Sequence, residues 1–443
     1  MLGFEAKLEG QNEQYRKLDE AIQAARFVRN SCLRYWMDNK DIGRYELSAY
    51  CAILAGQFEF AKKLNSMARQ ASAERAWSAI ARFYDNCKRG KPGKKGYPKF
   101  KKEQTHGSVE YKTSGWKFSE DRRYITFSDG FSLGTFKMWG TRDLHFYQLK
   151  QIKRVRVVRR ADGYYAQFCI DTERIEKREP TAHNIGIDVG LNHFYTDSDG
   201  KTVANPRHLR KSEKSLKRLS RRMSKTKKGS KNRAKFRNKL ARKHLKVSRQ
   251  RKDFAVKTAR CVVQSNDLVA YEDLKVRNMV RNRHLAKSIS DAAWTQFREW
   301  IEYFGHVFGV VTVAVPPHYT SQNCSNCGHV VKKTLSTRTH TCLHCGHVQD
   351  RDHNAARNIL EKALRTAGHV GTNASGENDL CLGEETPLSK PTHRKRKPKE
   401  QSLESPSMRE RGGCQPCINY AIARLPPHIA LVGLSPLFFP QIF

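Results

Sequence analysis

Two pairs of cysteines late in the chain constrain its folding more than any other feature. Cys324 and Cys327 form one pair, Cys342 and Cys345 form the other, and fourteen residues separate the two pairs. Thiolates at this spacing can surround a single zinc ion tetrahedrally while a short hairpin spans the gap. The glycine that follows each pair fits a tight turn. We therefore predict a structural zinc (Zn²⁺) site in a ribbon over residues 318–348, with no position left for water.

Three acidic residues stand where an isolated charge is costly. Asp188 lies inside the apolar run 185–190, Glu272 follows the apolar or aromatic residues 268–271, and Asp352 opens a predicted helix after the second cysteine pair. A carboxylate in an apolar setting must be paired or bind a cation. Magnesium and manganese prefer such oxygen ligands, and two such ions can activate water for phosphodiester cleavage. The trio therefore predicts a metal-dependent nuclease.

Two of the acids, taken alone, have an ordinary alternative. Asp188 could cap a turn, and Asp352 could be the N-cap of the helix that follows it. Asp350 lies close enough to compete with Asp352 as the third acid. Only the combination of all three acids favours a catalytic interpretation.

The charge of the chain indicates its partner. The 443 residues include 83 Lys and Arg against 43 Asp and Glu, which gives a formal charge of +40. Such an excess is best tolerated when a polyanion neutralises it, and nucleic acid is the obvious polyanion. A basic protein that is merely soluble or ribosome-associated is the alternative.

Cysteine usage and the apolar segments suggest a compartment. Twelve cysteines without a recognisable signal peptide indicate a reducing environment, so we expect the cytoplasm or nucleoid of a prokaryote. The most apolar stretch, 429–443, is interrupted by Pro436 and Pro440, so no membrane span is expected.

The N-terminal half changes its hydrophobic period twice. Residues 1–9 alternate like a strand, 10–90 have helical periodicity, and 91–180 return to alternation with aromatic and β-branched residues. This order predicts a β-rich, barrel-like domain formed by 1–9 and 91–180, into which a helical domain is inserted.

The C-terminal half predicts an α/β domain over 181–317 and 349–365. A long basic helical segment, about 207–263, lies between strand-like runs and is interrupted at Gly229-Ser230, which predicts a helical hairpin. Residues 310–315 read as a buried strand. Strands and helices in this order are compatible with an RNase H-like core. Residues 366–443 are polar and are predicted to be a disordered tail.

Three blocks of sequence resemble the TnpB family, the transposon-encoded relatives of the type V CRISPR effector nucleases. They are Gly-Ile-Asp-Val-Gly-Leu at 186–191, Tyr-Glu-Asp-Leu at 271–274, and Asp-Arg-Asp-His-Asn-Ala-Ala-Arg-Asn-Ile at 350–359. The resemblance implies a RuvC-like nuclease in which Asp188, Glu272 and Asp352, rather than Asp350, hold magnesium. It also implies that the β-rich part is a wedge domain, the inserted helices are a recognition domain, and the ribbon is the zinc-binding insertion.

The same resemblance implies an activity and its partners. An RNA from the transposon end would pair with target double-stranded DNA, and the nuclease would cut that DNA. Two alternatives remain open at this point. The chain could be a nucleic-acid-binding regulator of transposition that does not cut, or a transposase that acts on transposon ends without a guide.

Overall fold

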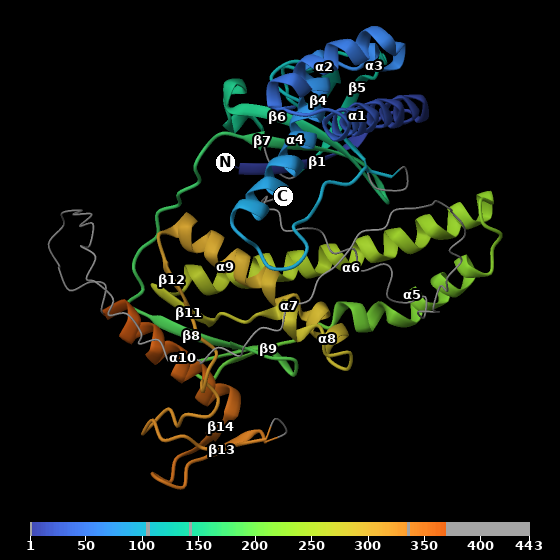
Figure 1. The fold of residues 1–443 in the computed structure, drawn as a ribbon. Helices are drawn as coiled ribbons and strands as arrows, with labels where there is room; N and C mark the ends of the chain where they lie inside the picture. The colour runs from blue at the N-terminus through green and yellow to red at the C-terminus, as the bar shows by residue number, and fades with distance from the viewer. Residues whose placement is uncertain (1, 103–106, 141–143, 335–336, 369–443) are drawn as a thin grey trace, which may run out of the picture. The chain divides into compact units, whose positions relative to one another are not determined.

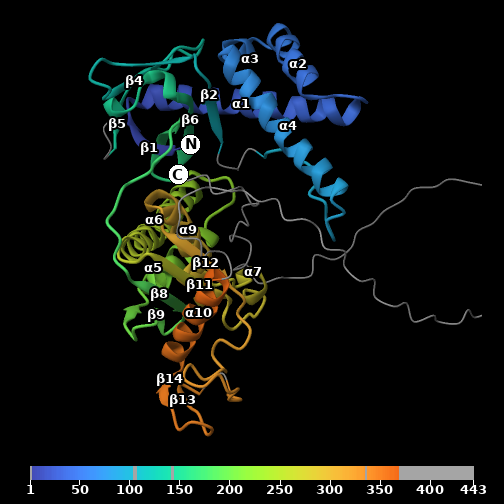
Figure 2. The same cartoon turned by 90° about the vertical axis from the view of Figure 1, so that its left-hand side faces the viewer.

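The computed structural model describes residues 2–102, 107–140, 144–334 and 337–368 (Figures 1 and 2). Of the predicted tail, residues 369–443 lie outside this description. The prediction of disorder was wrong for residues 366–368, because they continue the last helix. Within this helix the Thr366 hydroxyl donates to the Lys362 carbonyl. Among the described residues, no helix is long and apolar enough to cross a bilayer.

The N-terminal part contains a seven-stranded antiparallel sheet in the order β2-β6-β7-β1-β5-β4-β3. The first strand lies in the middle of the sheet, paired with β7 and β5. No pairing joins the edge strands β2 and β3 in the part of the chain described, so the ladder is open there. The strands are β1 (Leu2–Glu9), β2 (Ser108–Tyr111), β3 (Trp116–Phe118), β4 (Tyr124–Phe127), β5 (Gly134–Trp139), β6 (Ile152–Arg160) and β7 (Gly163–Ile170).

Four helices lie between β1 and β2 in the chain: α1 (Asn12–Asp38), α2 (Arg44–Gln57), α3 (Glu59–Lys63) and α4 (Ser66–Lys88). Buried residues of α1 recur every three or four positions, which gives the helix an apolar stripe. The first half of this stripe, including Leu18 and Ile22, packs in the core of the sheet. The second half, including Val28 and Leu33, packs with α2 and α4 in a separate helical core.

The C-terminal part is built on a five-stranded sheet in the order β10-β9-β8-β11-β12. The strands β8, β11 and β12 are parallel, whereas β9 and β10 are antiparallel to their neighbours. The carboxyl ends of β8 and β11 therefore meet at one edge. The strands are β8 (Asn184–Val189), β9 (His193–Asp197), β10 (Thr202–Ala204), β11 (Leu268–Glu272) and β12 (Val311–Val315).

The basic segment between β10 and β11 is two helices, α5 (His208–Ser224) and α6 (Lys231–Gln264), separated at the predicted interruption. Gly229 has a φ of 84°, which favours glycine, and the Ser230 hydroxyl caps α6 by accepting from the Arg233 amide. After β11 come α7 (Val276–Met279), α8 (Ala286–Ala292) and α9 (Trp294–Phe308).

Helices cover the two faces of this sheet differently. Alternate residues of β8 and β11, including Ile187 and Tyr271, pack against α6 and α9. The opposite face, which carries Ala270, packs against α10 (Arg351–Gly368) (Figure 1). The strand predicted at 310–315 is not fully buried, because β12 is the edge strand of the sheet and Val311 is 53% exposed.

The segment between β12 and α10 carries a small antiparallel hairpin, β13 (Thr339–Thr341) and β14 (Val348–Asp350). Both views place this hairpin at the N-terminal end of α10 (Figures 1 and 2). The finger, defined here as residues 318–350, thus leads directly into the helix that covers the sheet.

Candidate metal centres and nucleic-acid surface

Asp188 lies on the strand face that α10 covers. Gly186 and Gly190 share this face of β8 with Asp188, because side chains two apart point the same way. The backbone of α10 approaches so closely that a β-carbon at Gly186 would lie 2.2 Å from the Ala356 carbonyl oxygen. A β-carbon at Gly190 would lie 4.0 Å from Asp352 Oδ2. The strand and helix therefore run alongside each other with Asp188 next to the first turn of α10.

Glu272 reaches the same place from the neighbouring strand. In the parallel pairing, Tyr271 lies opposite Ile187, so Glu272 follows opposite Asp188 at the carboxyl ends of β11 and β8. The Thr320 hydroxyl donates to Glu272 Oε1. Glu272 of β11 and Asp352 of α10 are therefore electrostatic neighbours of Asp188 on β8.

The roles of Asp350 and Asp352 differ. Asp350 Oδ1 accepts from the backbone amides of Asp352 at 2.9 Å and His353 at 3.1 Å, so Asp350 is the N-cap of α10. The Asp352 carboxylate is therefore not the helix cap. Its Oδ2 lies 3.6 Å from Arg338 of the finger.

The electrostatics at the strand ends favour a bound cation. Burial raises the pKa of the Asp188 carboxyl well above its usual range, and the neighbouring Glu272 and Asp352 raise it further. Burial also raises the pKa of Glu272, against the lowering effect of the Thr320 hydrogen bond and Lys362. Carboxylates that repel one another in a desolvated site are suited to a divalent ion, which would relieve the repulsion.

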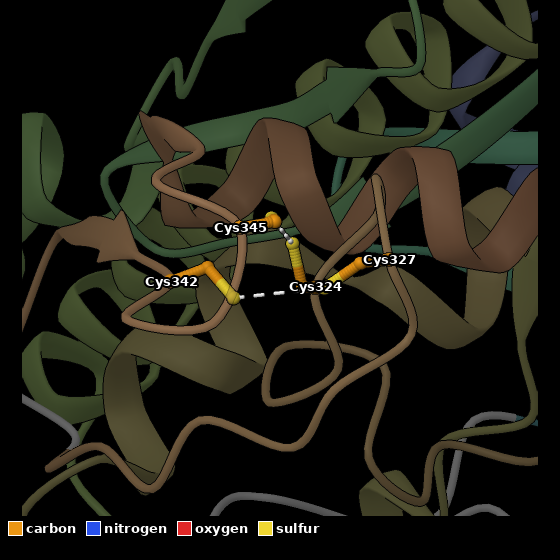
Figure 3. Close-up of side chains that lie close together, drawn as sticks. All are labelled: Cys324, Cys327, Cys342 and Cys345. Carbon is orange, nitrogen blue, oxygen red and sulfur yellow. Dashed lines mark hydrogen bonds between the residues drawn. The ribbon is translucent and has the colours of Figure 1, made fainter.

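The four predicted cysteines converge in the finger (Figure 3). Cys324 Sγ lies 3.7 Å from Cys345 Sγ, Cys327 Sγ lies 3.7 Å from Cys342 Sγ, and all four sulfurs lie within 4.8 Å of one another. Four sulfurs at about 2.3 Å from a zinc ion would be separated by roughly 3.8 Å. The thiols therefore fit a tetrahedral zinc ion.

The backbone repeats the same turn at both cysteine pairs. Gly328 and Gly346 donate to the carbonyls of the first cysteine of their pairs, at 2.8 and 2.9 Å, with φ angles of 74° and 71°. These conformations favour glycine. The backbone amide of His347 lowers the pKa of the Cys345 thiol to about 6, which favours the thiolate that binds metal.

Two asparagines join the finger to α10, and neither was predicted. Asn354 Nδ2 donates to the Asn323 carbonyl at 2.8 Å, and its Oδ1 accepts from the Ser325 amide at 2.9 Å. One turn later, Asn358 Nδ2 donates to the carbonyls of Thr320 and Asn323. Both asparagines are buried. Their spacing of four residues puts them on one face of the helix, which is the signal that could have revealed them.

A basic surface follows α5 and α6. Only two acidic residues, Glu213 and Asp253, occur over 208–264, and each pairs with nearby lysines. Most of the Lys and Arg side chains on these helices are exposed. A cationic ridge of this density is typical of proteins that lie along a nucleic-acid backbone.

Comparisons with known proteins identify the class of fold. A family described as "Probable transposase" matches residues 167–283, and a domain described as "Cas12f1-like, TNB domain" matches residues 294–359. The structure titled "Cryo-EM structure of the Cas12f1-sgRNA-target DNA complex" is similar with a TM-score of 0.50 at 15% identity, covering 79% of this chain and 83% of that one. The fold is therefore Cas12f1-like.

Sequence relatives narrow this class to a family. A "Putative RNA-guided DNA endonuclease" of Streptomyces pristinaespiralis is 31% identical, over 80% of this chain and 87% of the relative. The "Putative RNA-guided DNA endonuclease InsQ" of Escherichia coli (strain K12) is 29% identical, over 62% and 69%. The chain belongs to the TnpB family, which these relatives represent.

Proposed function

We propose that this protein is an RNA-guided DNA endonuclease that requires divalent metal ions for cleavage. The observation that carries the proposal is the close approach of α10 to Gly186, because it sets Asp352 beside Asp188 while β11 brings Glu272 opposite. The names of the sequence relatives support the guided activity and the DNA substrate.

The five-stranded sheet with α10 is the proposed nuclease domain, an RNase H-like (RuvC) core over 181–317 and 349–365. Three parallel strands, extended at one edge by β9 and β10, with acids at the parallel strand ends, support this assignment. The sheet of 1–9 and 91–180 is the proposed wedge domain, and the helices of 10–90 are the proposed recognition domain. The finger is the proposed zinc ribbon.

The chemistry needs few groups from the chain itself. Magnesium or manganese ions, when bound, would activate a water molecule and stabilise the leaving oxygen of the phosphodiester. Asp188, Glu272 and Asp352 would hold them. Thr320 fixes the orientation of Glu272 through its hydrogen bond, and the asparagines of α10 hold the Thr320 segment in place. The finger thus has a positioning role in the proposed site.

The basic helices α5 and α6 are the proposed contact for the nucleic-acid backbones. An RNA and a DNA held together require more positive surface than either alone, which agrees with the charge of +40. Tyr97 and Phe100, 53% and 41% exposed in a basic segment, offer rings on which bases can stack.

The test is purification of the protein expressed together with its flanking DNA, followed by sequencing of the bound RNA. DNA matching that RNA is then presented with magnesium. We expect cleavage by the native protein and none by Asp188→Ala, with bound RNA unchanged. Copurifying RNA without cleavage would support the regulator, and activity on transposon ends without RNA would support a direct transposase.

A further inference from the structure

A cavity of about 390 Å³ opens beside Glu272 and has no role in the chemistry above. It lies at the carboxyl ends of β8 and β11, where Val189 and Glu272 contribute to its lining. Tyr271 of β11, the loop after β11, α7 and the first two turns of α9 form the rest of it. Its volume is in the range of pockets that hold small organic ligands.

One wall of the cavity is apolar and aromatic. Trp294, Phe297 and Ile301 line it from consecutive turns of α9 and belong to the core beneath the sheet. These side chains are 6%, 1% and 1% exposed, so packing holds the wall in place before any ligand arrives. A flat, rigid wall of this kind suits an aromatic ring that stacks or packs edge-on.

The other wall carries more positive than negative charge. Lys275, Arg277 and Arg298 line it together with Glu272 and Asp273, and Arg298 pairs with Asp273 at 2.6 Å. The helix α9 also begins here without a side-chain cap, since its N-cap residue is Ala293 in a left-handed conformation. The start of an uncapped helix favours negative charge.

The indole of Trp294 provides an independent sign of a missing ligand. Its Nε1 is buried and has no hydrogen-bond acceptor among the residues described. A buried donor without an acceptor is rare and costs free energy. Trp294 also lines the cavity, so a ligand held there is the candidate acceptor.

We propose that this cavity holds the base of the nucleotide next to the scissile phosphate, in the DNA strand being cut. The aromatic wall receives the base, and Arg277 and the start of α9 receive a phosphate of the same strand. Because Glu272 lines the cavity and also belongs to the acidic trio, a base seated in the cavity anchors the neighbouring phosphate at the acids. This inference rests on the proposed nuclease function and adds a substrate-positioning role for Trp294 and Arg277.

The first experiment measures cleavage of matched DNAs that carry an abasic nucleotide at each position around the cut. Native protein should lose about tenfold in cleavage rate when the abasic nucleotide falls at one position adjacent to the cut, since stacking of one base contributes on that scale. The conservative variant Trp294→Phe keeps the ring and removes the N–H, and Arg277→Ala changes an exposed side chain. Both should cut intact DNA more slowly and should reduce the penalty of the abasic nucleotide.

The second experiment detects binding without cleavage. The fluorescent base 2-aminopurine is placed at each position near the cut, in DNA bound to the Asp188→Ala protein with its RNA. Its emission should change sharply at that same single position, and less so when Trp294→Phe is added. Circular dichroism and zinc content verify that each variant is folded.

The outcomes separate the two proposals. If native protein cuts matched DNA while the abasic scan is flat and both variants cut normally, the cavity does not hold a base and the nuclease function stands. If native protein does not cut any matched DNA, the nuclease function fails and the cavity assignment fails with it.

Discussion

A β-carbon added to Gly186 would lie 2.2 Å from the carbonyl oxygen of Ala356 and 2.8 Å from the amide nitrogen of Leu360. No real structure tolerates such contacts, and both atoms belong to helix backbone that cannot rotate away. The backbones of β8 and α10 can therefore approach each other only because Gly186 has no side chain. This close approach sets Asp352 beside Asp188.

Gly186→Ala should push α10 from the sheet. Overpacking of a tight core costs about 1–3 kcal/mol, so we expect lower thermal stability together with loss of cleavage. The matched control is Gly56→Ala in α2, where an added β-carbon meets nothing within 4 Å. There, relief of glycine's entropic cost should stabilise the protein by about 0.5–1 kcal/mol. Equal melting temperatures for the two variants would show that the close contact carries no strain.

Asp350→Asn and Asp352→Asn form a pair that removes the same charge two residues apart. Asparagine at 350 still accepts the amides of Asp352 and His353, so α10 stays capped and cleavage should persist. Loss of a residue that only hydrogen-bonds to a metal ligand reduces activity roughly 10–100-fold. Because Asp352 is itself a proposed ligand, Asp352→Asn should reduce the cleavage rate by more than that. Rates at saturating magnesium give the comparison, and a greater loss in Asp350→Asn would reverse the assignment.

Cys324→Ser should destabilise the finger and lower the zinc content of the purified protein. A closed four-thiolate site contributes its binding free energy to folding, so we expect a loss of several kcal/mol locally. Cys261→Ser, an exposed cysteine of α6, is the control and should retain both zinc and stability. Mass spectrometry of the native protein identifies the bound metal. If no zinc is found, the assignment of the four cysteines as a zinc site is wrong.

Lys101 should make stability depend on pH. Burial lowers its pKa to about 7, with contributions from Arg75 and Arg29, against about 10.5 in an unfolded chain. Between these values the unfolded chain binds more protons, so stability should rise as pH increases from 7 to 10.5. Lys101→Met should therefore be more stable at pH 6–7, by roughly 1 kcal/mol after solvent screening, with the advantage disappearing above pH 10.5. Denaturant titrations across this range test it, and a constant difference at all pH values would exclude Lys101 as the cause.

Arg218→Gln and Arg221→Gln should weaken nucleic-acid binding at low salt more than at high salt. Both side chains are exposed on α5 and have no ion pair among the described residues. Each phosphate contact removed should reduce the slope of log affinity against log salt by about 0.9 on a duplex. Lys257→Gln is the control, because Lys257 is already paired with Asp253 at 2.9 Å. This substitution should change the slope less. Identical slopes for all proteins would place these arginines outside the interface.

Features that depend on neighbours in the chain were predictable from the sequence. The two cysteine pairs with their glycines specify a four-thiolate cluster, because each turn is complete within five residues. The interruption of the basic helices at Gly229 and Ser230 is likewise a local matter of backbone conformation and capping. Periodicity alone also located the central strands of both sheets.

Features that depend on contacts distant in the chain were decided only by the tertiary structure. The resemblance favours Asp352 over Asp350 as the metal ligand, but only the hydrogen bonds of α10 show that Asp350 is the residue that caps the helix. Residues 310–315 read as a buried strand, but whether a strand lies at an edge depends on which strands pair, and β12 has one neighbour. The cavity beside Glu272 forms where the carboxyl ends of β8 and β11 lie next to the N-terminus of α9. No local sequence pattern predicts that these three elements lie together. Residue types and local spacing thus set the chemistry that is available, while long-range packing determines which groups share a site.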